Sequence, residues 1–428
     1  MQWLQSLLFL SLLSFAAVLG APSAHQNRPR TFKVDLVRRS NYVPNGLAAI
    51  KKAYAKFGII PSDINFGSML DLHIIPTTAD RTAVKQAEAP DENGAVQNVP
   101  AQNDVEYLSP VTIGGQEFVM NFDTGSADTW VFNTLLDQSQ TAGHAIFDPA
   151  KSTTFTELEG ATFNITYGDA SFAGGNVGLD TVDIGGATVQ KQAIGLPTEV
   201  SESFATDEAS DGLVGLAFTT INTMQPEAQT TFLENLAPDL DEPVFTAQLK
   251  AGKPGSYEFG KIDPAKFAGE MINIPVDNSR GFWEIQSSMF MVEGDEGITT
   301  VSGASSTTAI ADTGTTLMLV NLEIAEAYYA KVQGSQNSPA AGGFIYPCET
   351  ELPDLLVSIG DTHLARVTGD LINFATVGTD TTTNQELCFG GIQSNQGAGL
   401  QIWGDIFFKS IFVTFDLRGP SLGMAAHA

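Results

Sequence analysis

Cysteine, histidine and basic residues are scarce in this chain of 428 residues, and each shortage narrows the possible function. Only two cysteines and five histidines occur. The histidines do not have the spacing of a metal site, and there is no His-Glu-x-x-His motif. We expect no serine-hydrolase elbow and no phosphate-cradling loop. The chain is therefore expected to use neither a metal nor another cofactor.

Long apolar runs are also lacking, except for one near the start. Leu7 to Leu19 are almost entirely apolar, and the small residues Gly20 and Ala21 follow. This pattern predicts a signal peptide over residues 1–20. A membrane anchor is disfavoured because the run is short, no second span follows, and the last residues carry no apolar tail. We therefore expect a secreted protein without a membrane partner.

Basic residues are few and unevenly placed. Residues 1–85 hold 10 of the 21 Lys and Arg but only 4 of the 49 Asp and Glu, a net charge of +6, which leaves −34 for residues 86–428. This asymmetry predicts a basic propeptide over 21–85, ending between 85 and 92, that binds the acidic body and is released at low pH. Such acidity disfavours nucleic acid as a partner. Alternatively, the acidity serves only solubility.

The length exceeds what one hydrophobic core usually serves, so two lobes are expected. Short β-branched and aromatic runs, such as 106–112 and 116–122, predict mostly β-structure. We place an N-terminal lobe at 86–270 and a C-terminal lobe at 271–428, with the crossover near 265–280.

The leader contains the best helical stretch of the chain, Leu47 to Phe57, which Gly58 ends. One of its lysines is expected to reach the carboxylates described below, although the sequence does not distinguish which. The polar residues 77–103 are typical of a processing linker.

One motif occurs twice. Asn-Phe-Asp-Thr-Gly-Ser contains Asp123, and Ile-Ala-Asp-Thr-Gly-Thr contains Asp312. An apolar pair followed by glycine occurs 92 residues after each aspartate, ending at Gly215 and Gly404. This repetition predicts two similar halves that each supply one carboxylate.

Two facing carboxylates cannot both stay ionised, so they share a proton. The ionised group then activates a water, and the protonated group donates to a peptide carbonyl. Neighbouring motif residues are expected to support the pair: Gly125 and Gly314 allow the turns, Thr124 and Thr313 join the loops, and Ser126 and Thr315 donate to the outer oxygens.

The chain resembles the pepsin-like aspartic proteases, and most closely the fungal penicillopepsin and aspergillopepsin group. Besides the two motifs, the resemblance rests on residues 107–115, 211–218, 221–223 and 391–395, and it runs from about Val105 onward. It implies an all-β-dominated, bilobal fold with the active-site cleft between the lobes. It also implies an endopeptidase that acts in acid on peptides with bulky apolar residues, binds pepstatin-type inhibitors and is a monomer.

A second stretch, Asn164 to Ser171, has the pattern of a strand that enters a tight hairpin. The resemblance makes it the flap over the substrate, with Tyr167 and Gly168 at its tip and Trp130 as the partner of Tyr167. Asp169 and Ser171 match flap positions that accept a lysine before the cut bond, which implies trypsinogen activation. The substrate is also expected to contact Gly125, Gly314, Thr315 and Thr316. Asn164 begins a glycosylation sequon.

The two cysteines, Cys348 and Cys388, are expected to form one disulfide if the chain enters an oxidising compartment, and two buried thiols are the alternative. This pairing matches the fungal pattern. Trp403 departs from the family, where a smaller residue precedes Gly404, so the packing behind Asp312 is expected to differ. A catalytically dead relative that binds peptides, or an inert β-sandwich binding module, would be the alternative functions.

Overall fold

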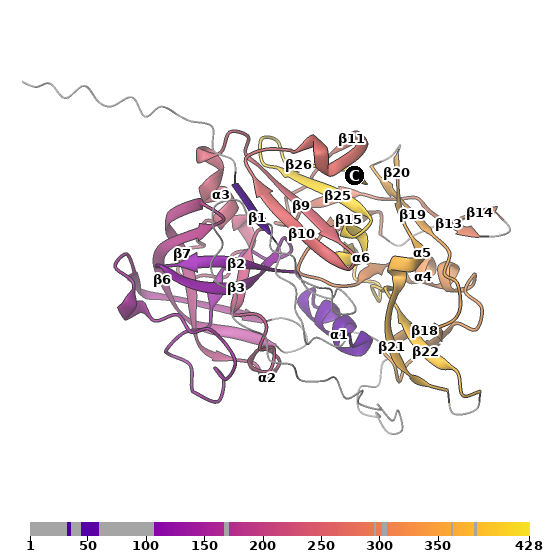
Figure 1. Ribbon diagram of the computed structural model, residues 1–428, viewed down its shortest axis with the longest axis horizontal. Helices are drawn as coiled ribbons and strands as arrows, with labels where there is room; N and C mark the ends of the chain where they lie inside the picture. The colour runs from indigo at the N-terminus through magenta and orange to yellow at the C-terminus, as the bar shows by residue number, and fades with distance from the viewer. Residues whose placement is uncertain are drawn as a thin grey trace, which may run out of the picture.

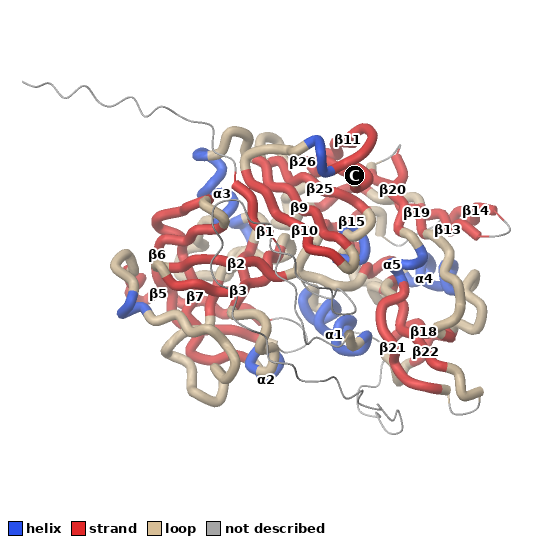
Figure 2. The backbone as a smooth tube through the Cα atoms, in the orientation of Figure 1, coloured by secondary structure: helices blue, strands red, loops and turns tan. Residues whose placement is uncertain are grey.

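In the computed structural model of this protein, the described residues are 32–35, 44–59, 107–166, 171–294, 297–301, 306–360, 363–380 and 383–428. The expected signal peptide and the linker at 77–103 lie outside them. Strands dominate the tube drawing of Figure 2, which confirms the mostly-β prediction.

The N-terminal half is built on one seven-stranded sheet, in the order β2-β3-β8-β4-β7-β6-β5. Its strands are β2 (Leu108–Ile113), β3 (Gln116–Asp123), β4 (Trp130–Val131), β5 (Thr156–Thr166), β6 (Phe172–Ile184), β7 (Ala187–Val200) and β8 (Gly212–Gly215). β5 and β6 pair antiparallel, starting with Thr166 opposite Phe172, as expected for the two arms of the predicted hairpin.

The C-terminal half contains three smaller sheets. The first comprises β12 (Glu284–Gln286), β15 (Thr308–Ala311), β24 (Gln401–Trp403), β16 (Met318–Val320) and β23 (Ile392–Ser394). The second comprises β14 (Gly297–Val301), β13 (Phe290–Gly294), β19 (Leu355–Ile359) and β20 (His363–Val367). The third comprises β17 (Gln336–Ser338), β18 (Gly343–Pro347), β22 (Glu386–Gly390) and β21 (Asn373–Thr379).

A six-stranded sheet joins the two halves, and Figure 1 shows it across the top of the molecule. Its order is β1 (Phe32–Asp35), β10 (Lys253–Phe259), β9 (Val244–Lys250), β25 (Ile411–Asp416), β26 (Ser421–His427) and β11 (Phe267–Pro275). β11 lies within the expected crossover region, and the expected boundary at residue 270 falls inside it.

The motif duplication is visible in the strand pairing. β3 pairs in parallel with β8, β8 pairs antiparallel with β4, and β4 pairs in parallel with β7. In the other half, β15, β24, β16 and β23 pair in the same sequence of directions. A Cβ atom on Gly215 would lie 2.5 Å from the backbone nitrogen of Asp128, and one on Gly404 would lie 2.1 Å from the Thr315 oxygen. The two glycines recur because the chain leaving each motif passes over them.

The helices are short and are α1 (Gly46–Lys56), α2 (Glu202–Ala205), α3 (Phe232–Leu236), α4 (Leu322–Tyr329), α5 (Gly369–Ile372) and α6 (Asp405–Phe408). Single 3-10 turns are η1 (Pro149–Lys151), η2 (Thr219–Ile221), η3 (Ala237–Asp239) and η4 (Pro264–Lys266).

Helix α1 is the predicted leader helix, and Figure 1 shows it between the two halves. The Asn45 side chain caps its start by accepting from the Ala48 nitrogen, at 3.0 Å. It ends before Gly58, whose φ is +63°. Its apolar face, with Ile50 and Tyr54, is buried in the larger of the two hydrophobic clusters that the described residues form.

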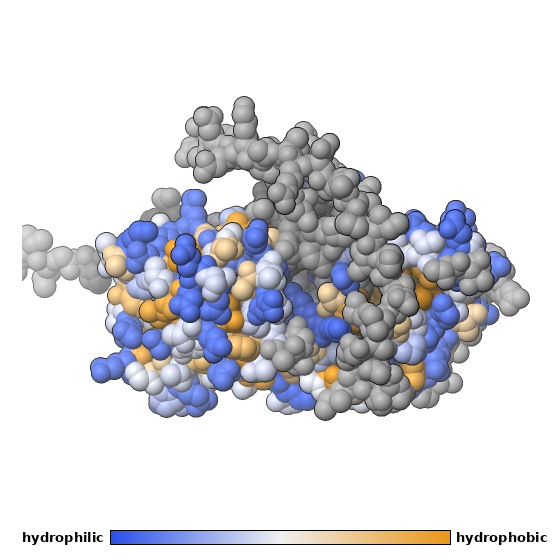
Figure 3. Space-filling view, turned by 90° about the horizontal axis from the view of Figure 1, so that it is seen from below, coloured by the Kyte–Doolittle hydropathy of each residue, from blue (hydrophilic) through white to orange (hydrophobic). Residues whose placement is uncertain are grey.

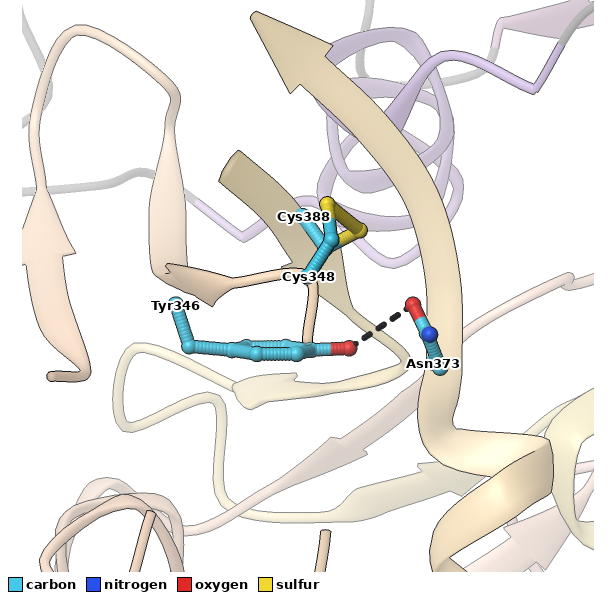
Figure 4. The surroundings of a disulfide bond; sticks show 4 residues. All are labelled: Tyr346, Cys348, Asn373 and Cys388. Carbon is cyan, nitrogen blue, oxygen red and sulfur yellow. Dashed lines mark hydrogen bonds between the residues drawn. A yellow bond between two sulfur atoms is a disulfide. The ribbon is translucent and has the colours of Figure 1, made fainter. Parts of the chain in front are cut away.

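The two cysteines form the expected disulfide, which joins β22 to the residue that follows β18. Cys348 and Cys388 are joined, and their Cα atoms are 4.9 Å apart. Beside the bridge, the Tyr346 hydroxyl donates to the Asn373 side-chain oxygen at 2.9 Å (Figure 4). The disulfide therefore ties together a sheet that helix α1 contacts through β21.

Candidate active site

Two loops bring the repeated aspartates to the centre of the molecule. Asp123 ends β3, and Asp312 directly follows β15, so each carboxyl group lies at the carboxyl end of a central strand. The Asp123 oxygen accepts from Leu216, and the Asp312 nitrogen donates to the Trp403 oxygen at 3.0 Å. Each loop is therefore held by the strand that carries the apolar-apolar-glycine repeat.

Each carboxylate accepts the same pair of hydrogen bonds from its own loop. Asp123 accepts from the Gly125 nitrogen at 2.8 Å and from the Ser126 hydroxyl at 2.6 Å. Asp312 accepts from the Gly314 nitrogen at 3.0 Å and from the Thr315 hydroxyl at 2.5 Å. In both cases the amide binds Oδ1 and the hydroxyl binds Oδ2, as twofold-related loops require.

The two loops are bonded to each other through their threonines. The Thr124 hydroxyl donates to the Ala311 oxygen at 2.8 Å, and the Thr313 hydroxyl donates to the Phe122 oxygen at 2.6 Å. The Thr124 and Thr313 nitrogens donate to the opposite hydroxyls at 3.2 and 3.0 Å. All of these groups are buried, so the bonds fix one loop relative to the other.

The glycines of the motifs lie against the opposite aspartate. A Cβ atom on Gly125 would be 2.5 Å from Asp312 Oδ1, and one on Gly314 would be 2.4 Å from Asp123 Oδ1. Any other residue at either position would strike the facing carboxylate. The two acids consequently share one small space, which is what joint use of a proton requires.

Lys56, in the last turn of α1, lies between the two acids. Its ammonium is 2.6 Å from Asp123 Oδ1, 2.6 Å from Asp312 Oδ1 and 2.8 Å from Asp312 Oδ2. Only 5% of its side chain is exposed. The sequence left open which leader lysine reaches the carboxylates, and the structure identifies Lys56.

The rest of α1 binds mainly to the C-terminal half. The Tyr54 hydroxyl donates to the Ser394 oxygen at 2.7 Å and accepts from Gln396 at 3.3 Å. The backbone of Gly46 lies so close to the Phe389 ring that a Cβ atom would be 2.2 Å from it. These contacts fix the rotation of the helix and so the direction of Lys56.

Burial and charge act differently on the two acids. Burial raises the pKa of both carboxyl groups. At Asp123 the Lys56 charge and the hydrogen bonds from Lys56 and Ser126 outweigh burial, so its pKa lies below the usual range. At Asp312, burial together with the negative charge of Asp123 raises the pKa to about 6, against the opposing effect of Lys56. Asp312 is the group that takes a proton first on acidification.

A pocket lies beside Asp123. It is lined on its apolar side by Trp130, Phe132, Phe204 and Leu213, and on its polar side by residues that include Asn121, Ser171, Asp207 and Ser210. Lys52 and Lys56 of α1 border it as well. The pocket thus places an apolar surface directly beside the acid pair.

The expected flap tip, with Tyr167, Gly168 and Asp169, lies outside the described residues. Ser171 is buried and lines the pocket, whereas Asn164 is exposed on β5. Thr316 is half-buried, and its oxygen accepts from Ile406. The buried indole nitrogen of Trp130 has no hydrogen-bond partner in the part of the chain that the structure describes.

Trp403 is fully buried behind Asp312, where its ring packs on Phe407 with 4.6 Å between ring centroids. The string Gly-Pro-Ser-Leu-Gly at 419–423 matches the letters of a serine-hydrolase elbow. Ser421, however, begins β26 and pairs with Asp416 and Pro275, so it does not sit on a strand-to-helix turn.

Sequence reasoning missed a buried carboxylate next to the first motif. Asp128 accepts from the Thr223 nitrogen at 3.1 Å, the Thr223 hydroxyl at 3.0 Å and the Asn222 side chain at 3.3 Å. Burial raises the pKa of Asp128 to about 6, although the Thr223 bonds act in the opposite direction. Its donors lie 94 and 95 residues away in the chain. In the sequence, only the string Ile-Asn-Thr at 221–223, which this chain shares with the fungal proteases, could have pointed to them.

Within the described ranges, no helix is long and apolar enough to cross a membrane. The same ranges contain no group of three or more His, Cys, Asp or Glu side chains arranged to hold a metal ion. Over the N-terminal half, on the left of Figure 3, hydrophilic and hydrophobic side chains are intermixed on the visible face.

This geometry, two hydrogen-bonded aspartates at the junction of two similar β-halves, defines an acid protease of the pepsin type. The chain belongs to the eukaryotic aspartyl protease family, whose model matches residues 106–427. It is 60% identical to aspartic protease PEP3 of Coccidioides posadasii, over 98% of this chain and 96% of that one. It is 46% identical to aspergillopepsin-1 of Aspergillus oryzae (78% and 80% covered) and 41% identical to penicillopepsin-1 of Penicillium rubens (98% and 98%). The chain is therefore a pepsin-like aspartic endopeptidase of the fungal type.

Proposed function

We propose that this chain is the inactive precursor of a secreted acid endopeptidase, with Asp123 and Asp312 as the catalytic pair. The observation that carries the proposal is the Lys56 ammonium, which contacts both carboxylates at 2.6 Å. In the converted enzyme a water takes this position, because it can accept and donate where the ammonium only donates.

The hydrogen bonds of the pair suggest how the reaction proceeds. The ionised carboxylate removes a proton from the water as its oxygen attacks the peptide carbonyl. The protonated carboxyl group donates to the carbonyl oxygen; when the tetrahedral intermediate collapses, the proton taken from the water passes to the departing amine and the hydroxyl proton returns to the carboxylate that gave it. Gly125, Ser126, Gly314 and Thr315 hold both acids in place, so the loops need little reorganisation during the reaction.

Acid would convert the precursor. The basic leader, with net +6, and the acidic body, with net −34 over residues 86–428, attract each other at neutral pH. Protonation of the body weakens this attraction, and protonation of Asp312 and then Asp123 removes the partners of Lys56. The leader at 21–85 then leaves the cleft between the lobes at 86–270 and 271–428 and is cut off in the polar linker.

The apolar side of the pocket supports cleavage at bulky apolar residues, whose side chain would pack against Trp130 and Phe204. Because Ser171 lines the same pocket, we extend the proposal to lysine before the cut bond, with Asp169 as its counter-charge. Trypsinogen activation would be the corresponding activity. The substrate backbone would contact Gly168, Thr316 and the tip residue Tyr167.

The expected signal peptide at 1–20 supports secretion, and the exposed Asn164 supports glycosylation at that residue. We extend the proposal to a monomer. Pepstatin-type inhibitors would bind the acid pair in place of the substrate. A catalytically inactive protein that binds peptides is the second candidate. Both aspartates are present and each accepts the same pair of hydrogen bonds from its own loop, which argues against this candidate.

The test uses the purified full-length chain at about pH 3.5 with unfolded haemoglobin, with and without pepstatin. The variant Asp312→Asn is the matched control, because it keeps the shape of the side chain and removes its acid chemistry. We expect pepstatin-sensitive cleavage and loss of the leader by mass spectrometry only in the wild type. Pepstatin binding without cleavage would favour the dead relative, and activity in Asp312→Asn would refute the assignment.

A further inference from the structure

His144 makes an unusual pair of contacts beside the substrate pocket. Its Nδ1 lies 3.0 Å from the Ser210 backbone oxygen, and its Nε2 lies 3.3 Å from the Ala205 backbone oxygen. Both partners are carbonyl oxygens, which only accept hydrogen bonds. A neutral imidazole carries one N–H and can satisfy one of them, whereas an imidazolium carries two and satisfies both.

The two carbonyls belong to one segment of the pocket. We define the wall segment as residues 204–210; three of its members, Phe204, Asp207 and Ser210, line the pocket beside Asp123. None of its seven residues is buried. The backbone nitrogens of Thr206, Asp207 and Ser210 donate to carbonyls of residues 202–207. The wall segment forms hydrogen-bonded turns of its own, Phe204 and Ala205 pack on a hydrophobic cluster, and His144 reaches the segment from a separate loop.

The His144 ring also packs against aromatic side chains. The ring stacks on Phe132, with centroids 3.7 Å apart and planes 8° from parallel, and an aromatic face attracts a cation. Phe132 packs on Trp130, and Trp130 contacts Phe204 edge-on, with ring centroids 5.1 Å apart. The His144 ring and the wall segment therefore belong to one aromatic cluster.

The charged groups near His144 are acidic. The Asp211 carboxylate follows the wall segment and accepts from Ala145, the next residue after His144, at 2.8 Å. Glu208 packs against Gly143, and Asp207 lies on the wall segment itself. Phe132 and its neighbours Val131 and Asn133 bring no charge.

We propose that His144 is a positioning residue of the substrate pocket: as an imidazolium it ties the wall segment by two simultaneous hydrogen bonds, and it loses one of them when it is deprotonated. Histidine side chains change charge between about pH 5 and 8. The wall segment is thus held by two hydrogen bonds from a charged His144 ring and by one from a neutral ring. This inference rests on the proposed function only in making the pocket a substrate site; the coupling of the ring to the wall is independent of it.

The first test needs no activity. The full-length protein is labelled with 15N-histidine, and the ring nitrogens are followed from pH 5 to 8, with the spectrum of His144→Gln assigning His144. Hydrogen exchange of residues 204–210 is measured over the same range, relative to buried strand β3. We expect protection of the wall to fall about five-fold as the His144 ring loses its proton. Unchanged relative protection across that deprotonation would overturn the proposal, even if His144→Gln did not fold.

The second test separates positioning from a general structural role. After acid conversion, peptides with Phe or Ala before the cut bond are compared at pH 5. In His144→Gln we expect KM for the Phe peptide to rise about five-fold, with kcat within two-fold and KM for the Ala peptide unchanged. The matched control is His363→Gln, an exposed histidine on β20. An equal rise in KM for both peptides, or no rise for either, would contradict the proposal. If the wild type cleaved neither peptide, that result would instead contradict the proposed function.

Discussion

Replacing Lys56 with methionine would reverse the way in which pH controls the leader. The ammonium touches both buried acids, and breaking a buried ion pair by removing one partner costs about 3–5 kcal/mol. This corresponds to a shift of roughly two to four orders of magnitude in the equilibrium between docked and released leader. Lys56→Met should therefore release helix α1 at pH 6 to 7, where the wild type keeps it docked.

The sign follows from the pKa shifts. In the wild type, Lys56 holds the pKa of Asp123 below its usual range, so its contribution to docking is present at neutral pH and lost as pH falls through that lowered value. Without the ammonium, burial dominates at both acids and raises their pKa values. Docking in Lys56→Met should then be weakest at neutral pH and improve on acidification, opposite to the wild type.

The assay is pepstatin binding to the full-length chain between pH 5 and 7, together with hydrogen exchange of residues 44–59. Lys51→Met is the control, because Lys51 lies half-buried on the same helix and undergoes the same change of side chain. We expect pepstatin binding at pH 6.5 by Lys56→Met alone. The reasoning is refuted if both variants match the wild type in binding and in the direction of their pH dependence.

Three further predictions concern the body. Because burial raises the pKa of Asp128 to about 6, the free energy of unfolding should fall by about 3 kcal/mol as pH rises through 4 to 6, and chemical denaturation of Asp128→Asn should show a flatter profile. Removing the disulfide with serines at Cys348 and Cys388, 40 residues apart, should cost about 4 kcal/mol, with an unchanged denaturation midpoint as the contrary result. Thr313→Val deletes the bond to the Phe122 oxygen and should cost about 2 kcal/mol and lower kcat more than it changes KM; a normal kcat would show that the loops need no such bond.

The parts of the site that the sequence predicted are the parts that short segments determine. Each Asp-Thr-Gly turn brings its own amide and hydroxyl donors within three residues of the aspartate, so both local networks could be foreseen. The leader helix was also foreseeable, because an alanine-rich run ended by Gly58 needs no distant partner to be recognised.

The remainder depends on contacts between distant segments. The choice of Lys56 over the other leader lysines is set by the rotation of α1, which Tyr54 fixes by bonding Ser394, 340 residues away. Phe132, directly after β4, and Phe204, in helix α2, reach the same pocket from distant segments and carry no local signature. The pairing of β9 with β25, which joins residues near 245 to residues near 415, also has no mark in either strand alone.

The burial of α1 has a consequence for the life of the protein after activation. Ile50, Ala53 and Tyr54 belong to the same hydrophobic cluster as the sheets of the body, so cutting away the leader removes a part of the core that helped to assemble it. We expect the converted enzyme to persist because it unfolds slowly, rather than because its native state remains the lowest in free energy. Once denatured at neutral pH it should fail to refold where the full chain succeeds, and equal refolding yields would disprove this. Activation would then be irreversible for folding as well: the mature enzyme would retain its native structure but could not refold to it once unfolded.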